Sequence, residues 1–210
     1  PYIKLPIGYG KLFYDQSVNW KYYTEPEENL HGKKMYWPRG KVLGGSSSIN
    51  AMVFARGSRN DFDEWGAHAS GWSWQDIEPF FRKMETWRGK SDQSRGQSGP
   101  VRVTDVSTQA HPLTDCFLEA TEQIGISKNP DYNTGNIEGS FVYQTNTHKG
   151  LRSSASNAYL STIKKQKNLV VITRALVKKI LFEGARAIGV EYSHKGNPKV
   201  VHATKEIILS

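Results

Sequence analysis

The chain has 210 residues, of which 37% are hydrophobic, and it carries a formal net charge of +8 with a pI near 9.5. This composition excludes a disordered chain, and no apolar run approaches the ~20 residues that a membrane-spanning helix needs. The single cysteine, Cys116, excludes an internal disulfide and leaves the compartment open. A cytoplasmic or membrane-peripheral location is the expectation.

The positive charge raises the question of a nucleic-acid partner. Lysines and arginines are spread along the chain, with short clusters at 164–167 and 178–179. Such spacing is more typical of solvated protein faces than of a nucleic-acid site. We therefore expect no nucleic-acid partner, and a basic nucleic-acid-binding module stays as an alternative.

The first half of the chain predicts a hairpin followed by helices. Residues 19–24 and 34–37 have strand patterns and are separated by turn residues. A helix is expected from Ser58, and Ser73 with Asp76 forms a capping box for the next helix. Pro79 is expected to end that helix and open another, in which Phe80, Met84 and Trp87 share one face.

The second half predicts strands after a further helix. The polar stretch 88–100 is expected to be a loop, 101–103 a strand, and 112–124 a helix with one apolar stripe. The run 169–173 resembles a buried strand, a three-stranded meander follows, and another strand is expected from 205. The meander strands are expected at 178–182, 187–192 and 199–203. The fold class is therefore α/β, in the sense of an α+β mix.

The stretch 37–57 is the most informative in the chain. Gly44 and Gly45 lie between an apolar pair, Val42 and Leu43, and three serines. Paired glycines let another group approach the backbone, and serines before an apolar segment are candidate helix N-caps. The pattern predicts an anion-binding corner for a phosphate or an electron-rich ring edge. A flexible linker is a poorer interpretation because its flanks would be polar, and a Walker phosphate loop fails because Lys41 precedes the glycines.

This stretch resembles the first signature of the glucose-methanol-choline family of FAD-dependent alcohol oxidoreductases. The signature places are filled without departure by Gly40, Lys41, Leu43, Gly44, Gly45, Ser46, Ser47, Ile49, Asn50, Phe54, Gly57 and Asp63. Two further segments are similar to the family pattern, one before the signature and one after it. They consist of Trp20, Tyr22, Thr24, Glu25 and Pro26, and of Gly150, Arg152, Ser154, Tyr159 and Leu160.

The resemblance implies part of a FAD-binding Rossmann-like domain and part of a substrate-binding domain. Residues 1–58 and 166–210 would belong to the FAD-binding domain, the latter with the strand and the β-meander, and residues 59–165 to the substrate domain and connecting segment. The family's Gly-x-Gly-x-x-Gly turn is absent from these residues, and the chain ends in the middle of an expected core strand. We therefore expect an internal fragment whose catalytic histidine lies downstream of Ser210.

The resemblance also implies a function. The enzyme would oxidise a small-molecule alcohol at its CH–OH group by hydride transfer to FAD, with oxygen, a quinone or a carrier as electron acceptor. The bacterial choline and aliphatic-alcohol dehydrogenases are the most similar in this stretch. Some members attach FAD through a histidine before the signature asparagine; that position is Ile49, so non-covalent FAD is expected. The residues expected to bind the cofactor are Arg39, Val42, Gly44, Gly45, Ser46, Asn50, Ala51, Met52, Val53 and Val177.

No residue of this chain is expected to be catalytic, and no metal site is expected. The histidines are scattered, without the short spacing of a metal site or an obvious carboxylate partner; they are His31, His68, His111, His148, His194 and His202. A catalytically inactive scaffold of the same fold stays as the second alternative.

Overall fold

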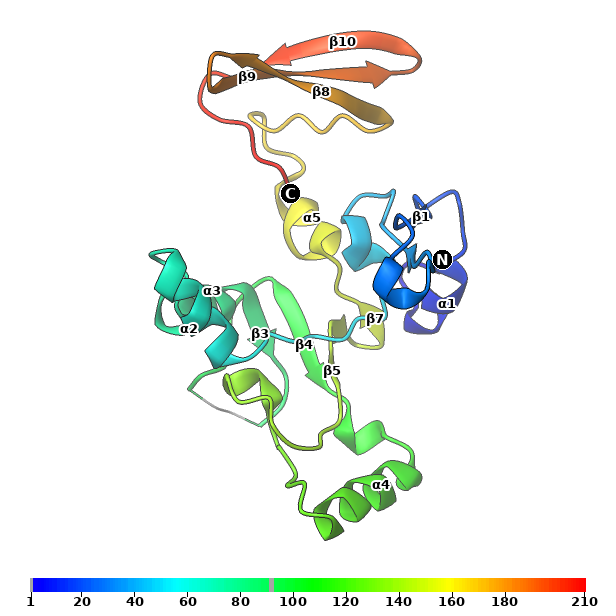
Figure 1. The fold of residues 1–210 in the computed structure, drawn as a ribbon, viewed down its shortest axis with the longest axis vertical. Helices are drawn as coiled ribbons and strands as arrows, with labels where there is room; N and C mark the ends of the chain where they lie inside the picture. The colour runs from blue at the N-terminus through cyan, green and yellow to red at the C-terminus, as the bar shows by residue number, and fades with distance from the viewer. Residues whose placement is uncertain (1, 91–92) are drawn as a thin grey trace. The chain divides into compact units, whose positions relative to one another are not determined.

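A computed structural model describes residues 2–90 and 93–210. The chain divides into two compact units, Pro1–Lys164 and Lys165–Ser210 (Figure 1). Part of the polar stretch 88–100, residues 91–92, lies outside the described residues.

The first unit begins with short helices and a small hairpin. These are η1 (Pro6–Gly8), α1 (Tyr9–Leu12), β1 (Tyr22–Tyr23), η2 (Glu28–Leu30) and β2 (Tyr36–Trp37). Strands β1 and β2 pair antiparallel, and an isolated bridge between Asn19 and Gly40 extends the pairing. The predicted hairpin is confirmed, and it leads into the short helix η3 (Gly45–Ser48).

Two helices follow the signature, α2 (Arg59–His68) and α3 (Trp74–Met84). The Ser58 side chain caps α2, and Ser73 with Asp76 forms the predicted capping box of α3. The prediction that Pro79 ends α3 is wrong, since Pro79 lies inside this helix. An interior proline removes one backbone hydrogen bond. Aromatic packing offsets that loss: the Phe81 ring lies 5.9 Å from Phe62 and 6.2 Å from Trp74, centroid to centroid.

The core of this unit forms around a three-stranded sheet. Strand β3 (Glu85–Trp87) pairs parallel with β4 (Val101–Asp105), which pairs antiparallel with β5 (Gln144–Thr145). The buried apolar cluster consists of Phe54, Trp87, Val101, Val103 and Ala158, with Met84 packed against it. Trp87 therefore belongs to a strand, and Phe80 is exposed, so the predicted shared helical face of Phe80, Met84 and Trp87 is wrong.

The rest of this unit consists of short elements and one longer helix. The short elements are η4 (Ser107–Gln109), η5 (Tyr132–Thr134), β6 (Thr147–His148), β7 (Leu151–Arg152), the π-helix η6 (Ser156–Leu160) and α5 (Ser161–Ile163). Helix α4 (Pro112–Gln123) confirms the predicted helix, but Leu113, Phe117 and Ile124 of its apolar stripe are exposed.

A buried ion cluster joins strand β3 to the segment before α2, the loop between β3 and β4, and the residue before η5. The Arg56 guanidinium donates to Glu85 Oε1 at 2.6 Å, and Arg95 Nε donates to the same oxygen at 2.8 Å. Arg95 also pairs with Asp131 at 2.7 Å. Two positive and two negative charges therefore balance within the cluster. Arg95 lies in the stretch expected to be a loop, and it is buried.

The second unit is a three-stranded antiparallel sheet. Strands β8 (Ala175–Glu183), β9 (Arg186–His194) and β10 (Asn197–His202) lie in the order β10-β9-β8, as the meander prediction requires. The pairing of β8 with β9 has irregularities, one between Val177 and Lys179.

The strand predictions at 169–173 and from 205 are wrong. Neither stretch has regular structure, and Val170, Ile208 and Leu209 are 80%, 76% and 76% exposed. An apolar run becomes a strand only when a neighbouring strand accepts and donates its backbone hydrogen bonds. Among the described residues, no strand pairs with either run.

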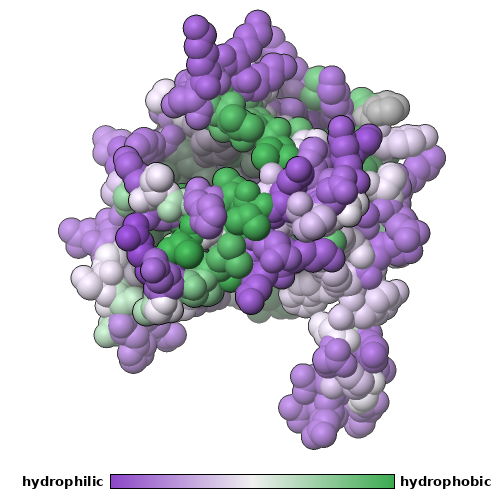
Figure 2. Space-filling model, turned by 90° about the horizontal axis from the view of Figure 1, so that it is seen from above, coloured by the Kyte–Doolittle hydropathy of each residue, from purple (hydrophilic) through white to green (hydrophobic). Residues whose placement is uncertain are grey.

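Hydrophobic side chains reach the surface in both units. Figure 2 shows some of them as green atoms among hydrophilic ones. Across residues 2–90 and 93–210, every helix is too short or too polar to cross a lipid bilayer.

Candidate functional site

The signature segment is anchored to the preceding loop by a buried asparagine. Asn19 is 1% exposed; its Oδ1 accepts from Arg39 N at 3.0 Å and its Nδ2 donates to Phe13 O at 2.7 Å. Two backbone bonds reinforce this contact, Trp20 N to Arg39 O at 2.9 Å and Lys41 N to Val18 O at 2.7 Å. The chain therefore enters the glycine pair from a fixed direction.

The three glycines of the signature have different physical roles. A Cβ on Gly40 would lie 2.2 Å from the backbone of Gly45, so this position must lack a side chain for the turn to close. Gly44 has a φ of +88°, and a Cβ there would lie 2.5 Å from Ser48 Oγ. Gly45 has a φ of +53°, but a Cβ there would meet no heavy atom within 4 Å. The backbone at Gly45 is therefore open to an approaching group, as the glycine pattern predicts.

The serines do not cap a long helix, which corrects the sequence prediction. Residues 45–48 form only the short helix η3, without a side-chain cap, and its N-cap residue is Gly44. Ser46 Oγ accepts from Gly40 N at 3.1 Å, while Ser48 Oγ donates to Leu43 O at 2.8 Å. Ser47 Oγ donates to Gly44 O at 2.5 Å and accepts from Ala155 N at 2.9 Å. These hydroxyls therefore close the loop on itself and on the 152–157 segment.

Asn50 is held by its carbonyl oxygen. Oδ1 accepts from Met52 N at 3.1 Å and from Arg152 Nη1 at 2.8 Å. Both partners are donors, so the oxygen must face them and the amide NH₂ must face the other way. In the sequence, Arg152 belongs to a segment similar to the family pattern, which does not predict its contact with Asn50.

The residues after Asn50 place their side chains differently. Met52 is 5% exposed and has a φ of +64°; its N donates to Asn50 Oδ1 and its O accepts from Asn146 N at 2.7 Å. Val53 is 41% exposed and forms a bridge with Thr145, and Ala51 is half-buried. Of the three, only Val53 offers an exposed side chain to a ligand.

Two exposed cations flank the glycine turn. The Arg39 guanidinium lies 4.9 Å from the centroid of the Trp37 ring, and Lys41 Nζ lies 4.9 Å from that of Trp20. The sequence has no acidic residue between positions 39 and 53. This segment therefore supplies positive charge that would attract an anion and contributes no carboxylate of its own.

The predicted site residues divide between the two units. Arg39 to Val53 lie in one continuous segment of the first unit, whereas Val177 lies on β8 of the second unit. Val177 is exposed and adjoins the irregularity in the β8–β9 pairing, the kind of position at which a strand re-aims its backbone groups. Its role stays a prediction.

One cavity borders the signature. It has a volume of about 370 Å³ and is lined by Ile3, Lys4, Val42, Leu43, Ser48, Ser154, Ser156 and Asn157. It joins the signature to the 154–157 segment and to the start of the chain. Val42 is the one predicted site residue in its wall.

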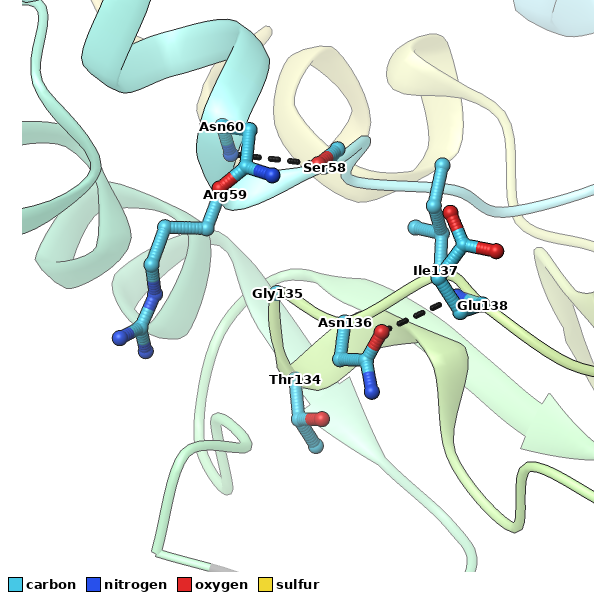
Figure 3. A pocket seen from close by; sticks show the side chains of 8 residues that line it. All are labelled: Ser58, Arg59, Asn60, Thr134, Gly135, Asn136, Ile137 and Glu138. Atoms are coloured by element: carbon cyan, nitrogen blue, oxygen red, sulfur yellow. Dashed lines mark hydrogen bonds between the residues drawn. The ribbon is translucent and has the colours of Figure 1, made fainter.

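A second cavity, also of about 370 Å³, lies at the start of α2 (Figure 3). Asn60 N donates to Ser58 Oγ at 3.2 Å and Glu138 N donates to Asn136 Oδ1 at 3.1 Å, so its polar groups bond to one another. None of the predicted site residues lines it.

Sequence reasoning missed the buried polar groups of the first unit. Neither the Arg56–Glu85–Arg95 cluster nor the Arg152–Asn50 contact has a local signal, because its partners lie far apart in the chain. Among the described residues, no three His, Cys, Asp or Glu side chains gather where they could hold a metal ion.

The comparisons with known proteins agree with the signature. The model of the family described as GMC oxidoreductase matches residues 17–210. The chain belongs to the GMC oxidoreductase family. The family resemblance inferred from the signature is thereby confirmed, and so is the mixed α/β fold class.

Three relatives of this GMC chain are informative. Human mitochondrial choline dehydrogenase is 41% identical over 209 residues, which is 99% of this chain and 35% of the relative. The oxygen-dependent choline dehydrogenase of Rhizobium etli is 40% identical over 211 residues, covering 100% of this chain and 38% of the relative. The crystal structure of pyridoxine 4-oxidase from Mesorbium loti superposes with a TM-score of 0.89 at 28% identity, over 96% of this chain and 40% of that one. This chain thus spans well under half the length of these relatives.

Proposed function

We propose that the chain is part of a flavin-dependent oxidoreductase that oxidises the CH–OH group of a small alcohol. FAD would bind non-covalently along residues 39–53, with a further contact from the backbone near Val177. The names of the relatives support this class, since two are choline dehydrogenases and one is a pyridoxine 4-oxidase. Oxygen, a quinone or a protein carrier would take the electrons.

The residues present fit FAD in charge and in space. FAD carries a pyrophosphate, which suits the exposed cations Arg39 and Lys41 and the backbone at Gly45. Its ring system is rich in acceptor atoms, which suit the outward amide NH₂ of Asn50. The open backbone of Gly45 is the observation that carries the proposal.

When bound, the flavin would accept a hydride from the alcohol carbon. The contribution of this chain is to bind and orient it. Gly44 and Gly45 would let the backbone approach the cofactor, and Ser46 would fix the turn through its bond to Gly40. Ile49 is 1% exposed and has no nucleophilic atom, so this position cannot attach the flavin covalently.

The first test is the absorbance spectrum of the full-length protein, purified without added cofactor. Flavin bands that bleach under anaerobic conditions with choline, or with another member of a panel of small alcohols, would support the proposal. Acid precipitation should release all of the flavin. A colourless protein that FAD cannot reconstitute would contradict the proposal and favour an inactive scaffold, and binding to nucleic acid that weakens steeply with salt would favour the nucleic-acid module.

A matched pair of glycine variants tests where FAD lies. Gly45→Ala and Gly184→Ala both place a Cβ in open space at nearly the same φ, +53° and +58°. Their effects on stability should therefore be similar. Only Gly45→Ala should weaken FAD binding, by about tenfold, because its methyl group would occupy space needed by the cofactor. Equal FAD affinity in both variants, measured by flavin fluorescence titration, would contradict this placement.

A further inference from the structure

Arg152 is a buried arginine that joins three segments of the first unit. It is 3% exposed. Its Nε donates to Ile3 O at 2.8 Å, and its Nη1 donates to Ser47 O at 3.1 Å and to Asn50 O at 2.7 Å. Its own backbone N donates to Lys4 O at 2.9 Å. The start of the chain, the signature and the 151–152 strand therefore meet at this side chain.

The charge of Arg152 has no counter-ion in the described part of the chain. Each of its side-chain partners is a neutral oxygen, and its Nη2 is buried without a hydrogen-bond partner among the described residues. Burial lowers the pKa of this guanidinium, which records the cost of holding the charge away from water. A lone buried cation of this kind is costly to stability.

The contact between Arg152 and Asn50 fixes the orientation of the Asn50 side-chain amide. Two donors, Arg152 Nη1 and Met52 N, converge on Asn50 Oδ1. The opposite orientation of the amide would set NH₂ against both donors, so the orientation is fixed by chemistry. Asn50 is half-buried, and its Nδ2 has no partner in residues 2–90 and 93–210.

We propose that Arg152 is a positioning residue that fixes the Asn50 amide with its NH₂ toward the electron-accepting ring of the cofactor and places an uncompensated positive charge behind it. The proposal rests on the proposed function, because it requires a flavin on the outward side of Asn50. The amide supplies a hydrogen bond to a ring acceptor atom. The guanidinium favours the negative charge that the ring gains on reduction.

The first experiment replaces the guanidinium in the full-length holoprotein. Arg152→Met removes both the charge and the donors, so FAD should bind about tenfold more weakly, as expected for loss of one well-placed hydrogen bond. The reduction potential of the bound flavin should fall. Arg152→Lys keeps the charge and should keep more of the potential than Arg152→Met does.

Arg56→Met is the matched control. Arg56 is also 3% exposed, but its charge is paired with Glu85 within the ion cluster. This variant should lose stability and leave the flavin potential unchanged. If Arg152→Met likewise loses stability but keeps the flavin potential unchanged, the role of Arg152 is structural and the proposal is wrong. This holds even if the variant binds FAD more weakly.

A second variant covers the case in which Arg152→Met does not fold. Asn50→Asp keeps an acceptor toward Arg152 and Met52 but replaces the outward NH₂ by an oxygen. We expect it to fold, to bind FAD at least tenfold more weakly and to lower the flavin potential. Wild-type affinity and potential in Asn50→Asp would overturn the proposal. A wild-type protein without flavin would instead contradict the proposed function.

Discussion

The first unit buries arginines in two places, and the two places differ in how the charge is balanced. Around Glu85, the guanidinium groups of Arg56 and Arg95 are paired with carboxylates at 2.6 and 2.8 Å, and Arg95 also reaches Asp131. Arg152 has only carbonyl and amide oxygens as partners. Each site has one buried guanidinium nitrogen without a partner among the described residues, Arg56 Nε and Arg152 Nη2, so the sites differ in the balance of charge. A cluster that balances its own charges leaves no net charge for a ligand to pair with. A cation that is not balanced is suited to a bound group that gains negative charge.

The pKa directions do not divide the arginines in the same way, because burial lowers the pKa of Arg56 within the ion cluster despite its pair with Glu85. Burial lowers the pKa of Arg95 as it does that of the other two arginines, but hydrogen bonds and charge from Glu85 and Asp131 outweigh it, so the pKa of Arg95 is raised. For Arg152 burial is the cause of the lowered pKa, and no carboxylate opposes it. Carboxylates therefore oppose the effect of burial on both arginines of the ion cluster, whereas among the described residues none does so for Arg152.

The largest expected effect comes from removing the carboxylate that balances the ion cluster. Glu85→Gln leaves Arg56 buried without its carboxylate partner and Arg95 with Asp131 alone, so the free energy of unfolding should fall by about 3–5 kcal/mol. Denaturant unfolding of the full-length protein measures this loss. The control is Glu122→Gln, whose pair with Lys128 at 2.8 Å is exposed on both sides, so its loss should change the free energy of unfolding far less. Equal losses in the two variants would mean that the cluster is not a stabilising centre.

The next effect tests the loop that Arg152 supports. Gly44→Ala forces a side chain into a left-handed conformation and sets its Cβ 2.5 Å from Ser48 Oγ and 3.0 Å from Ser156 Cβ. We expect a loss of about 2–3 kcal/mol in the free energy of unfolding, from the conformation and from the overlap together. Gly45→Ala, with no atom within 4 Å, should lose only about 1 kcal/mol. If thermal melting shows the same loss for both, the turn is looser than its contacts indicate.

The sequence predicts the parts of the molecule that have local signals. The hairpin before the signature, the start of α2, the capping box of α3 and the meander β8–β10 follow from turn residues, caps and alternation over a few positions. The glycine pattern likewise predicts an open backbone, and the structure has it at Gly45.

The failures share a cause, which is the need for a distant partner. The apolar run 169–173 looks like a strand but has no neighbour to pair with in the described chain. Pro79 lies inside a helix whose Phe81 packs against Phe62 of the preceding helix, a contact between elements that the proline itself does not indicate. Arg56 and Asn133 are 77 positions apart, and Arg152 and Asn50 are 102 apart. No pattern in a window of ten or twenty residues can indicate such a contact.

The smallest expected effect would convert the Arg152 site into one that resembles the ion cluster. Asn50→Asp gives the buried guanidinium a carboxylate in place of an amide oxygen at 2.8 Å. A hydrogen bond to a charged acceptor exceeds one to a neutral acceptor by about 1 kcal/mol, so the flavin-free protein should become more stable by roughly that amount. Asn50→Leu is the control; it removes the acceptor for Arg152 and Met52 and should be destabilising. If urea unfolding shows that Asn50→Asp also destabilises the flavin-free protein, Arg152 is already compensated. The inferred difference in charge balance between the ion cluster and Arg152 would then be wrong. A gain in stability together with weaker flavin binding would instead show that Asn50 favours cofactor binding over stability.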